Sequence, residues 1–275
     1  MKFQKPETDV PAILADKEYS AASLFDPKSL LREARRQKQL LPEPVPAICI
    51  LDPDGDIGRF LRRTGQARLF RNWPCYHTEL LTFELGSQTA GIICCAVGAP
   101  FAVLVAEELF ACGCKLLLSI TSAGQLVPSG SPPYFVIIDR SLRDEGTSHH
   151  YAQAATFAYA DQRLVRAAEN AAATSGLRIV TGGSWTTDAP FHETERAILA
   201  ARAKGLLAVE MEAAALYSFA LRQAVPVLCL AHVTNTMGHA EQDFEKGDAD
   251  GAADALQLLR AISDELLPIA DSTTV

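Results

Sequence analysis

Residues 208–215 read Ala-Val-Glu-Met-Glu-Ala-Ala-Ala and join two kinds of local structure. The apolar residues 207–209 predict a short buried strand, and the alanine-rich run 213–223 predicts a helix. Carboxylates at this junction can accept hydrogen bonds from a vicinal diol, with Met211 as an adaptable apolar floor for a sugar ring. They can equally stabilise the start of the helix through its dipole. The residue types alone leave both interpretations open.

The same alternation of strand and helix extends in both directions from this junction. Further strands are predicted at 47–51, 91–97, 115–120, 134–138, 177–181 and 226–231, and further helices at 27–39, 102–112, 160–174, 193–203 and 249–267. Because several of these strands are apolar throughout, helices must cover both faces of the sheet. The sequence therefore predicts an α/β fold with three layers, α/β/α, around a central mixed, mostly parallel sheet. We expect a single domain over residues 1–275, with residues 1–45 forming an N-terminal arm and helix.

The composition excludes several classes of protein. The chain has 275 residues, a net charge of −8 and a pI near 5.3, whereas a nucleic-acid binder usually carries a basic surface. The apolar stretches are too short to span a bilayer, and the first residues lack the apolar core of a signal peptide. The seven cysteines lie mostly in apolar runs, which is typical of reduced, structural thiols. We therefore expect a cytoplasmic protein without a nucleic-acid or membrane partner.

Two candidate binding motifs follow predicted strands, where parallel sheets bind their ligands. Residues 55–59, Gly-Asp-Ile-Gly-Arg, follow the strand 47–51, and turn amides beside an arginine suit an oxyanion. Residues 121–124, Thr-Ser-Ala-Gly, are predicted to form a turn whose small side chains let a ligand approach the backbone. Each motif alone also fits an ordinary surface turn. A polar loop is predicted at 139–151.

No metal site is predicted. His149 and His150 are adjacent in the polar loop, whereas a metal needs three or four converging ligands. The acidic run from Glu241 to Asp250 lacks the spacing of a calcium loop. We expect this run to be a solvated loop before the last helix.

Three ordered motifs resemble the nucleoside phosphorylase family, which includes uridine phosphorylase, hexameric purine nucleoside phosphorylase and the adenosylhomocysteine-type nucleosidases. Residues 209–214 resemble the family signature, and residues 55–59 resemble its N-terminal phosphate loop, with Ile57 where proline is usual. The loop 143–151 is most similar to the uridine phosphorylase branch. The similarity runs from about Val45 to the closing helix, and it implies a phosphorylase/hydrolase-like form of the three-layer fold.

The resemblance implies roles for individual residues. Catalytic roles fall on Arg59, Arg196 and Glu212. Substrate contacts fall on Gly55, Arg71, Thr121, Ser122, Gly124, Phe191, Thr194, Glu210, Met211 and Asn235. In the family pattern, phosphate lies against Gly55, Arg59 and Ser122, while Met211 and Glu212 hold the ribose. Arg196 stands where an arginine meets the pyrimidine carbonyl, and Arg71 resembles the arginine that reaches into a neighbouring subunit. The resemblance therefore implies a homo-oligomer, either a dimer or a hexamer of dimers.

Three positions depart from the family pattern. Ser119 stands where the strand normally carries an arginine that grips phosphate, so the phosphate site is weakened. Thr194 stands where a glutamine normally pairs with uracil. Asn235 replaces the acid that protonates a purine, and an amide cannot donate that proton, which disfavours purine chemistry.

The leading hypothesis is phosphorolysis of a uridine-like pyrimidine nucleoside to a free base and ribose 1-phosphate. The glycosidic bond stretches first and leaves an oxocarbenium-like sugar, which the co-substrate phosphate captures. Arg196 would stabilise charge on the departing base, and the reaction needs no metal or organic cofactor. Two alternatives stay open: hydrolysis on the same fold, which Ser119 favours, and a non-catalytic nucleoside-binding or storage protein.

Overall fold

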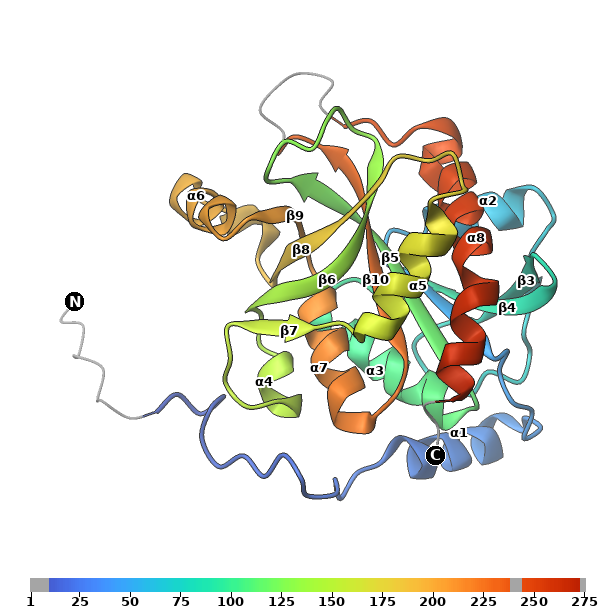
Figure 1. Cartoon of the computed structure of the whole chain (residues 1–275). Coiled ribbons are helices and arrows are strands. Elements are labelled where there is room, and N and C mark those ends of the chain that lie inside the picture. The colour runs from blue at the N-terminus through green and yellow to red at the C-terminus, as the bar shows by residue number, and fades with distance from the viewer. Residues whose placement is uncertain (1–9, 238–243, 273–275) are drawn as a thin grey trace.

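The computed structural model describes residues 10–237 and 244–272, and within them one ten-stranded sheet has the order β10-β6-β8-β9-β5-β1-β4-β3-β2, with β7 beside β6 (Figure 1). The strands are β1 (Ile48–Asp52), β2 (Arg68–Leu69), β3 (Leu81–Leu85), β4 (Gln88–Cys94), β5 (Leu116–Gln125), β6 (Tyr134–Asp144), β7 (Phe157–Tyr159), β8 (Ile179–Thr187), β9 (Leu206–Glu210) and β10 (Val227–Asn235). Parallel and antiparallel pairs both occur, and the two longest ladders, β6–β8 and β5–β10, are parallel. The mixed α/β sheet is confirmed.

Part of the sheet closes on itself. Strand β10 pairs with β5 as well as with β6, so β5, β10, β6, β8 and β9 form a ring. Strand β1 then attaches to β5, and β4, β3 and β2 continue the sheet outward. Strand β1 is buried along its whole length, as its apolar sequence requires. It ends at Asp52, where the turn of the candidate site begins.

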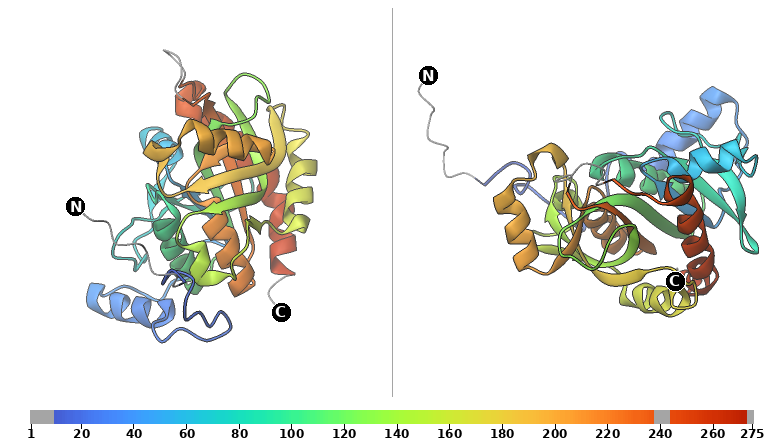
Figure 2. Two further views of the ribbon diagram at one scale, coloured as in Figure 1. Left: turned by 90° about the vertical axis from the view of Figure 1, so that its left-hand side faces the viewer. Right: turned by 90° about the horizontal axis from the view of Figure 1, so that it is seen from above.

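Helices cover both faces of this sheet. The helices are α1 (Pro27–Lys38), α2 (Asp56–Arg63), α3 (Ala99–Ala111), α4 (Ser148–Tyr151), α5 (Gln162–Ala172), α6 (Glu195–Ala203), α7 (Ala213–Gln223) and α8 (Ala252–Asp271), with 3-10 turns η1 (Pro190–His192) and η2 (Asp248–Gly251). On one face α7 packs against α3 and α4, and on the other α8 packs against α5 and α2 (Figure 2). The predicted three layers are therefore confirmed.

The segment before the sheet contains the predicted N-terminal helix, and part of the predicted arm is described. Helix α1 begins at Pro27, and the Asp26 side chain caps it by accepting a hydrogen bond from the Ser29 amide. The chain from residue 10 to α1 runs past α4 and α7 without regular secondary structure (Figure 1). Residues 1–9 of the predicted arm lie outside the described residues.

Two predicted loops are wrong. Residues 121–124 are not a turn but the end of β5, because Gly124 pairs with Asn235 of β10 and with Val209 of β9. Much of the predicted loop 139–151 is also strand, since β6 pairs with β8 as far as Asp144. In both cases the neighbouring strands supply main-chain hydrogen bonds that override the turn preference of small and polar residues.

The acidic run before the last helix is only partly described. Residues 238–243, which include Glu241 and Asp243, lie outside the described part of the chain. Residues 244–247 form no helix or strand, as predicted, and lead into η2.

Candidate active site

The turn between β1 and α2 is shaped by Asp52. Its carboxylate accepts hydrogen bonds from the backbone amides of Gly55 at 3.0 Å and Gly58 at 2.9 Å. Burial raises the pKa of Asp52 to about 6. Gly55 has φ +76°, and a Cβ there would lie 2.8 Å from both Arg59 Nη1 and Cys95 Sγ. Only glycine fits this position, which is why the turn can bring Arg59 back over its own backbone.

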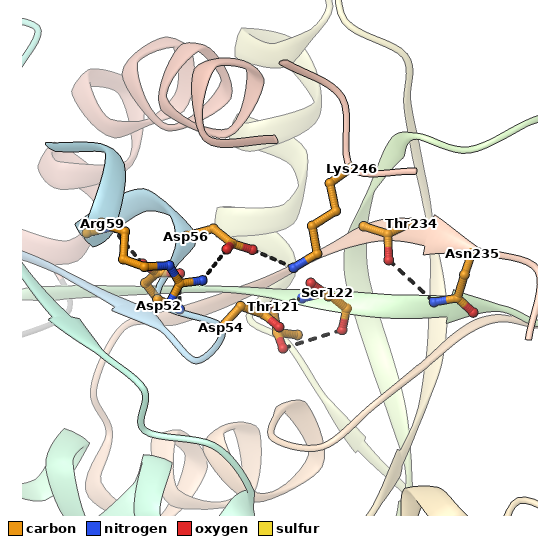
Figure 3. A network of polar contacts seen from close by, with 11 residues as sticks. Asp52, Asp54, Asp56, Arg59, Thr121, Ser122, Thr234, Asn235 and Lys246 are labelled. Atoms are coloured by element: carbon orange, nitrogen blue, oxygen red, sulfur yellow. Dashed lines mark hydrogen bonds and ion pairs between the residues drawn. The ribbon is translucent and has the colours of Figure 1, made fainter. Parts of the chain in front are cut away.

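Two cations meet on one carboxylate above this turn. Asp56 is bonded to the Arg59 guanidinium, and its other oxygen lies 2.5 Å from Lys246 Nζ (Figure 3). Lys246 is anchored nearby because the Glu245 amide donates to the Thr234 carbonyl at 2.7 Å. The sequence analysis missed Lys246, since a single lysine in an acidic run carries no recognisable signal.

The end of β5 faces the same turn. The backbone N–H of Ser122 donates to Asp54 Oδ2 at 2.6 Å (Figure 3). Ser122 is therefore joined to the turn through Asp54, and a carboxylate of the chain itself engages its amide. Asp54 is a second residue that the sequence analysis did not single out.

Ser119 lies deeper on β5. It is buried between Leu51 of β1 and Cys229 of β10, and within residues 10–237 and 244–272 its hydroxyl has no hydrogen-bond partner. The position that carries a cation in the family pattern therefore offers only a neutral, enclosed hydroxyl. Lys246 is the additional cation of the cluster.

Glu210 is held entirely by the protein. Its Oε2 accepts from the amides of Glu212 and Ala213, both at 2.7 Å. Its Oε1 accepts from three buried hydroxyls, those of Ser141, Ser184 and Thr186. The expectation of a substrate contact at Glu210 does not fit this arrangement, because its lone pairs are already used. Glu210 instead fixes the start of α7 and with it Glu212.

Glu212 has fewer hydrogen-bond partners than Glu210. One carboxylate oxygen accepts from the Gly98 amide at 2.7 Å, while Oε2 is buried and has no partner in the described part of the chain. Burial, followed by the nearby charge of Glu210, raises the pKa of Glu212 to about 8. Met211, half-buried, lies between them and its Cε approaches the Gly98 backbone. An unpartnered, buried oxygen beside a methionine is suited to accept sugar hydroxyls.

Other residues predicted to contact the substrate take part in packing or hydrogen bonds within the protein. Gly124 is packed under Met237 and Val209, so it serves strand packing. Asn235 accepts from the Met237 amide at 2.9 Å, and Thr121 is buried beside Ser122 at the end of β5. The Thr121 side chain also lies close enough to Glu212 to lower the pKa of that carboxyl by hydrogen bonding.

Three predicted base contacts lie on the segment around α6, at the margin of the molecule (Figure 1). Phe191 is 99% exposed, Arg196 is exposed, and the Thr194 hydroxyl accepts from the Ala197 amide as the helix cap. The structure therefore does not bring Phe191, Thr194 and Arg196 into contact with Glu212. Arg71, after β2, is exposed as well.

A large cavity lies away from these residues. A space of about 1250 Å³ lies between the N-terminal segment and helices α3, α4 and α7, and Tyr19, Glu107, Tyr151 and Phe219 are among its lining residues. None of the predicted site residues lines it. The described residues contain no cluster of three or more His, Cys, Asp or Glu side chains placed to hold a metal ion. None of their helices is long and apolar enough to cross a membrane.

The mixed sheet with helices on both faces is a fold shared with nucleoside phosphorylases and nucleosidases of known structure. The chain belongs to the phosphorylase superfamily, which it matches over residues 47–266. It is similar to a uridine phosphorylase of Vibrio fischeri, with a TM-score of 0.66 at 19% identity over 83% of this chain and 94% of that one. It is also similar to a 5'-methylthioadenosine/S-adenosylhomocysteine nucleosidase of Neisseria meningitidis, with a TM-score of 0.63 at 20% identity over 78% and 97% of the two chains.

Two curated relatives are similar in sequence. A uridine phosphorylase of Thermococcus kodakarensis is 28% identical over 62% of this chain and 66% of its own length. A guanosine phosphorylase of Halorubrum lacusprofundi is 27% identical over 47% of this chain and 54% of its own length. The chain thus spans less than two thirds of the length of either relative.

The raised pKa of Glu212 predicts a pH-dependent stability. The folded state holds a proton that the unfolded state has lost between the ordinary pKa of 4.5 and about 8, so this contribution to stability is present below pH 4.5 and disappears as the pH rises through 8. Glu212→Gln removes the titration, so the fall in Tm between pH 5 and 8 shrinks by on the order of 5 °C. Thermal melts of both proteins across this range test it. Asp52 titrates in both, so equal slopes in the two proteins would contradict the assignment to Glu212.

Proposed function

We propose that the chain cleaves the N-glycosidic bond of a nucleoside and transfers the pentose to phosphate. The observation that carries this proposal is the Glu212 carboxylate, which is buried, fixed through Gly98, and left with one unpartnered oxygen in the described residues. The charge of Asp54, the residue before Gly55, acts on Glu212, which supports a sugar on Glu212 and Met211 with an anion at the neighbouring Gly55–Arg59 turn. Family membership supports an enzyme of this kind.

In this proposal each part of the site has a chemical task. Glu212 accepts hydrogen bonds from the ribose hydroxyls and fixes the sugar, so little freedom is lost at the chemical step. As the C1′–N bond stretches, positive charge develops on the sugar, and phosphate at Gly55, Arg59 and Lys246 stabilises it and then bonds to C1′. The electron pair of the broken bond leaves with the base.

We propose that the preferred base is a pyrimidine. Asn235 cannot act as the acid that a purine leaving group needs at N7, which supports a pyrimidine. The two curated relatives, a uridine and a guanosine phosphorylase, differ in the base that their names specify. Arg196 would reach the pyrimidine only if the α6 segment moves inward when substrate binds. No metal or organic cofactor enters the proposal.

The side chain of Arg71 bears on the assembly of the protein. Arg71 is exposed and makes no ion pair or hydrogen bond within the described part of the chain, as suits a side chain that acts in a neighbouring subunit. We therefore propose a homo-oligomer, a dimer or a hexamer of dimers, whose partners are nucleoside and phosphate.

The experiment incubates the pure protein with uridine, thymidine, inosine and adenosine, with and without phosphate, and measures the free base. Phosphate-dependent release together with pentose 1-phosphate is the expected result. No release from any nucleoside would refute the enzymatic proposal. Hydrolysis is the second candidate, because the enclosed Ser119 hydroxyl supplies no charge to a phosphate.

Lys246 is predicted to supply the cation that β5 lacks. Because a charge-assisted contact contributes about 1.5–3 kcal/mol, Lys246→Met is expected to raise the phosphate KM by at least ~10-fold. The nucleoside KM should change little, since Glu212 and Met211 are untouched. Steady-state kinetics with phosphate varied at saturating nucleoside test this.

Lys115→Met is the matched control. Lys115 also pairs with one carboxylate, Asp271, at 2.9 Å, but it lies at the surface away from the site. If the two variants have the same phosphate KM, Lys246 has no part in binding phosphate.

A further inference from the structure

The cavity between the N-terminal segment and helices α3, α4 and α7 has no part in the proposed function. Its volume is about 1250 Å³, and small-molecule sites typically enclose roughly 300–1,000 Å³. Phe219 and Gln223 line it from the second half of α7, whereas Glu212 precedes the first residue of that helix. The space is therefore large enough for an organic molecule, and it is separate from the site around Glu212.

The N-terminal segment forms one wall of this cavity (Figure 1). The Tyr19 hydroxyl donates to the His149 carbonyl of α4 at 3.4 Å. The Arg222 guanidinium of α7 donates to the Ala21 carbonyl at 2.9 Å. The segment is thus joined to both helices, and it encloses the space from one side.

Carboxylates outnumber cationic side chains in the lining. Five carboxylates line the cavity, against one lysine and one arginine: Glu18, Asp26, Glu107, Glu108 and Asp188, with Lys28 and Arg222. A concave surface with an excess of one charge concentrates ligands of the opposite charge. The cavity is therefore suited to a cation.

Two adjacent glutamates of α3 are the strongest sign of an occupant. Glu108 is 3% exposed, and its Oε2 has no hydrogen-bond partner among the residues described. Glu107 Oε1 accepts from two neutral donors, the Tyr151 hydroxyl at 3.2 Å and the Gln223 amide at 3.4 Å. Within residues 10–237 and 244–272 neither carboxylate forms an ion pair. Because buried carboxylates are normally paired, a bound cation would supply the missing partner.

Aromatic rings lie beside Glu107 in the same lining. The ring centroid of Phe219 lies 5.9 Å from that of Phe110 and 5.9 Å from that of Tyr151, which it meets edge to face. The faces of such rings attract ammonium groups, and quaternary ammonium ions are recognised in this way. Hard metal ions instead need oxygen ligands around most of their surface. Rings and carboxylates together therefore favour an organic cation over an inorganic one.

We propose that this cavity is a binding site for an organic ammonium ion. The charged head lies against the carboxylates of Glu107 and Glu108 and the adjacent aromatic cluster. The apolar part lies along the N-terminal segment, where Ile13 and Phe25 line the cavity. Nucleoside and phosphate are not bound here, so both sites can be filled at once.

Calorimetric titration with choline tests the charge requirement. Its neutral analogue 3,3-dimethylbutanol, in which carbon replaces the nitrogen, has nearly the same shape. Wild type should bind choline at least about tenfold more tightly than this alcohol, because only choline gains from the carboxylates and the ring faces. Equal affinities for the two probes, or no binding of choline, would overturn the proposal.

Substitutions in the lining locate the bound probe. Glu107→Gln and Glu108→Gln keep the shape and remove the charge, so each should weaken choline binding by about tenfold and leave the alcohol unaffected. Phe110→Leu should weaken choline binding about threefold. Glu169→Gln, on the exposed face of α5, is the control and should match wild type. Melting curves show that each variant is folded, and unchanged choline affinity in both α3 glutamine variants would refute the site.

A competition measurement separates this site from the one around Glu212. Choline affinity should be the same with and without uridine or inorganic phosphate, and the same in Glu212→Gln. Displacement of choline by uridine or phosphate would place it in the other site and overturn the proposal. Because none of these measurements needs turnover, failure to cleave any nucleoside would refute the proposed function and leave this inference standing.

Discussion

Glu212→Gln is expected to lower kcat/KM for the nucleoside by about 100-fold. The carboxylate offers one fixed oxygen to Gly98 and a second, unpartnered one to the sugar, and a charge-assisted hydrogen bond contributes about 1.5–3 kcal/mol, or roughly 10- to 150-fold. Glutamine preserves the shape but removes the charge that the carboxylate carries above its pKa of about 8, so at about pH 9 both ribose hydroxyls lose part of their interaction. Base release measured at that pH against nucleoside concentration gives the change.

Glu169→Gln is the matched control, because Glu169 is an exposed residue of α5. Its kinetics should equal those of wild type. The 2′,3′-dideoxy analogue of the substrate lacks the hydroxyls that Glu212 is proposed to bind. With wild type, its kcat/KM should be nearly as low as that of the natural substrate with Glu212→Gln. If Glu212→Gln retains full activity, Glu212 does not bind the sugar.

Glu210→Ala is expected to lower the free energy of unfolding by about 3–5 kcal/mol and the Tm by about 10 °C. The change leaves the amides of Glu212 and Ala213 buried without their acceptor, and each unsatisfied buried donor costs about 1–3 kcal/mol. The hydroxyls of Ser184 and Thr186 lose a partner as well. Urea or thermal unfolding measures the loss.

Glu210→Gln should lose much less stability. The amide oxygen can take the place of Oε2 and accept from the two backbone N–H groups, which cannot reverse their role. The amide nitrogen then faces the hydroxyls of Ser184 and Thr186, which can rotate to accept from it. Equal destabilisation by alanine and glutamine would show that the carboxylate charge, rather than acceptor geometry, stabilises this junction.

The parts of the fold that follow from local periodicity were predictable. The helix expected at 213–223 is α7 residue for residue, and the buried strand at 47–51 is β1 displaced by one residue. Both are set by their own apolar or alanine-rich sequences. The ends of β5 and β6 were not predictable in this way, because they extend only where β8, β9 and β10 pair with them.

The site residues likewise differ in whether local sequence predicts them. Motifs that shape their own backbone, the Gly55–Arg59 turn and the Glu210–Glu212 junction, were found from sequence. Lys246 was missed because only the segment before α8 brings it to Asp56. The expected place of Arg196 came from family position alone, and in the structure α6 carries it at the margin of the molecule.

Closure of β5, β10, β6, β8 and β9 into a ring has a consequence for how the site can adapt. Ser122 lies on β5 and Glu212 directly follows β9, and these two strands are hydrogen-bonded neighbours. The distance between Ser122 and Glu212 therefore cannot change without breaking main-chain hydrogen bonds between strands of the ring. By contrast, Lys246 is joined to the α2 turn through a single carboxylate. Backbone amides under the sugar should thus exchange with deuterium slowly whether or not substrate is present, and a change in exchange on binding should be confined to the turn and the 244–247 segment.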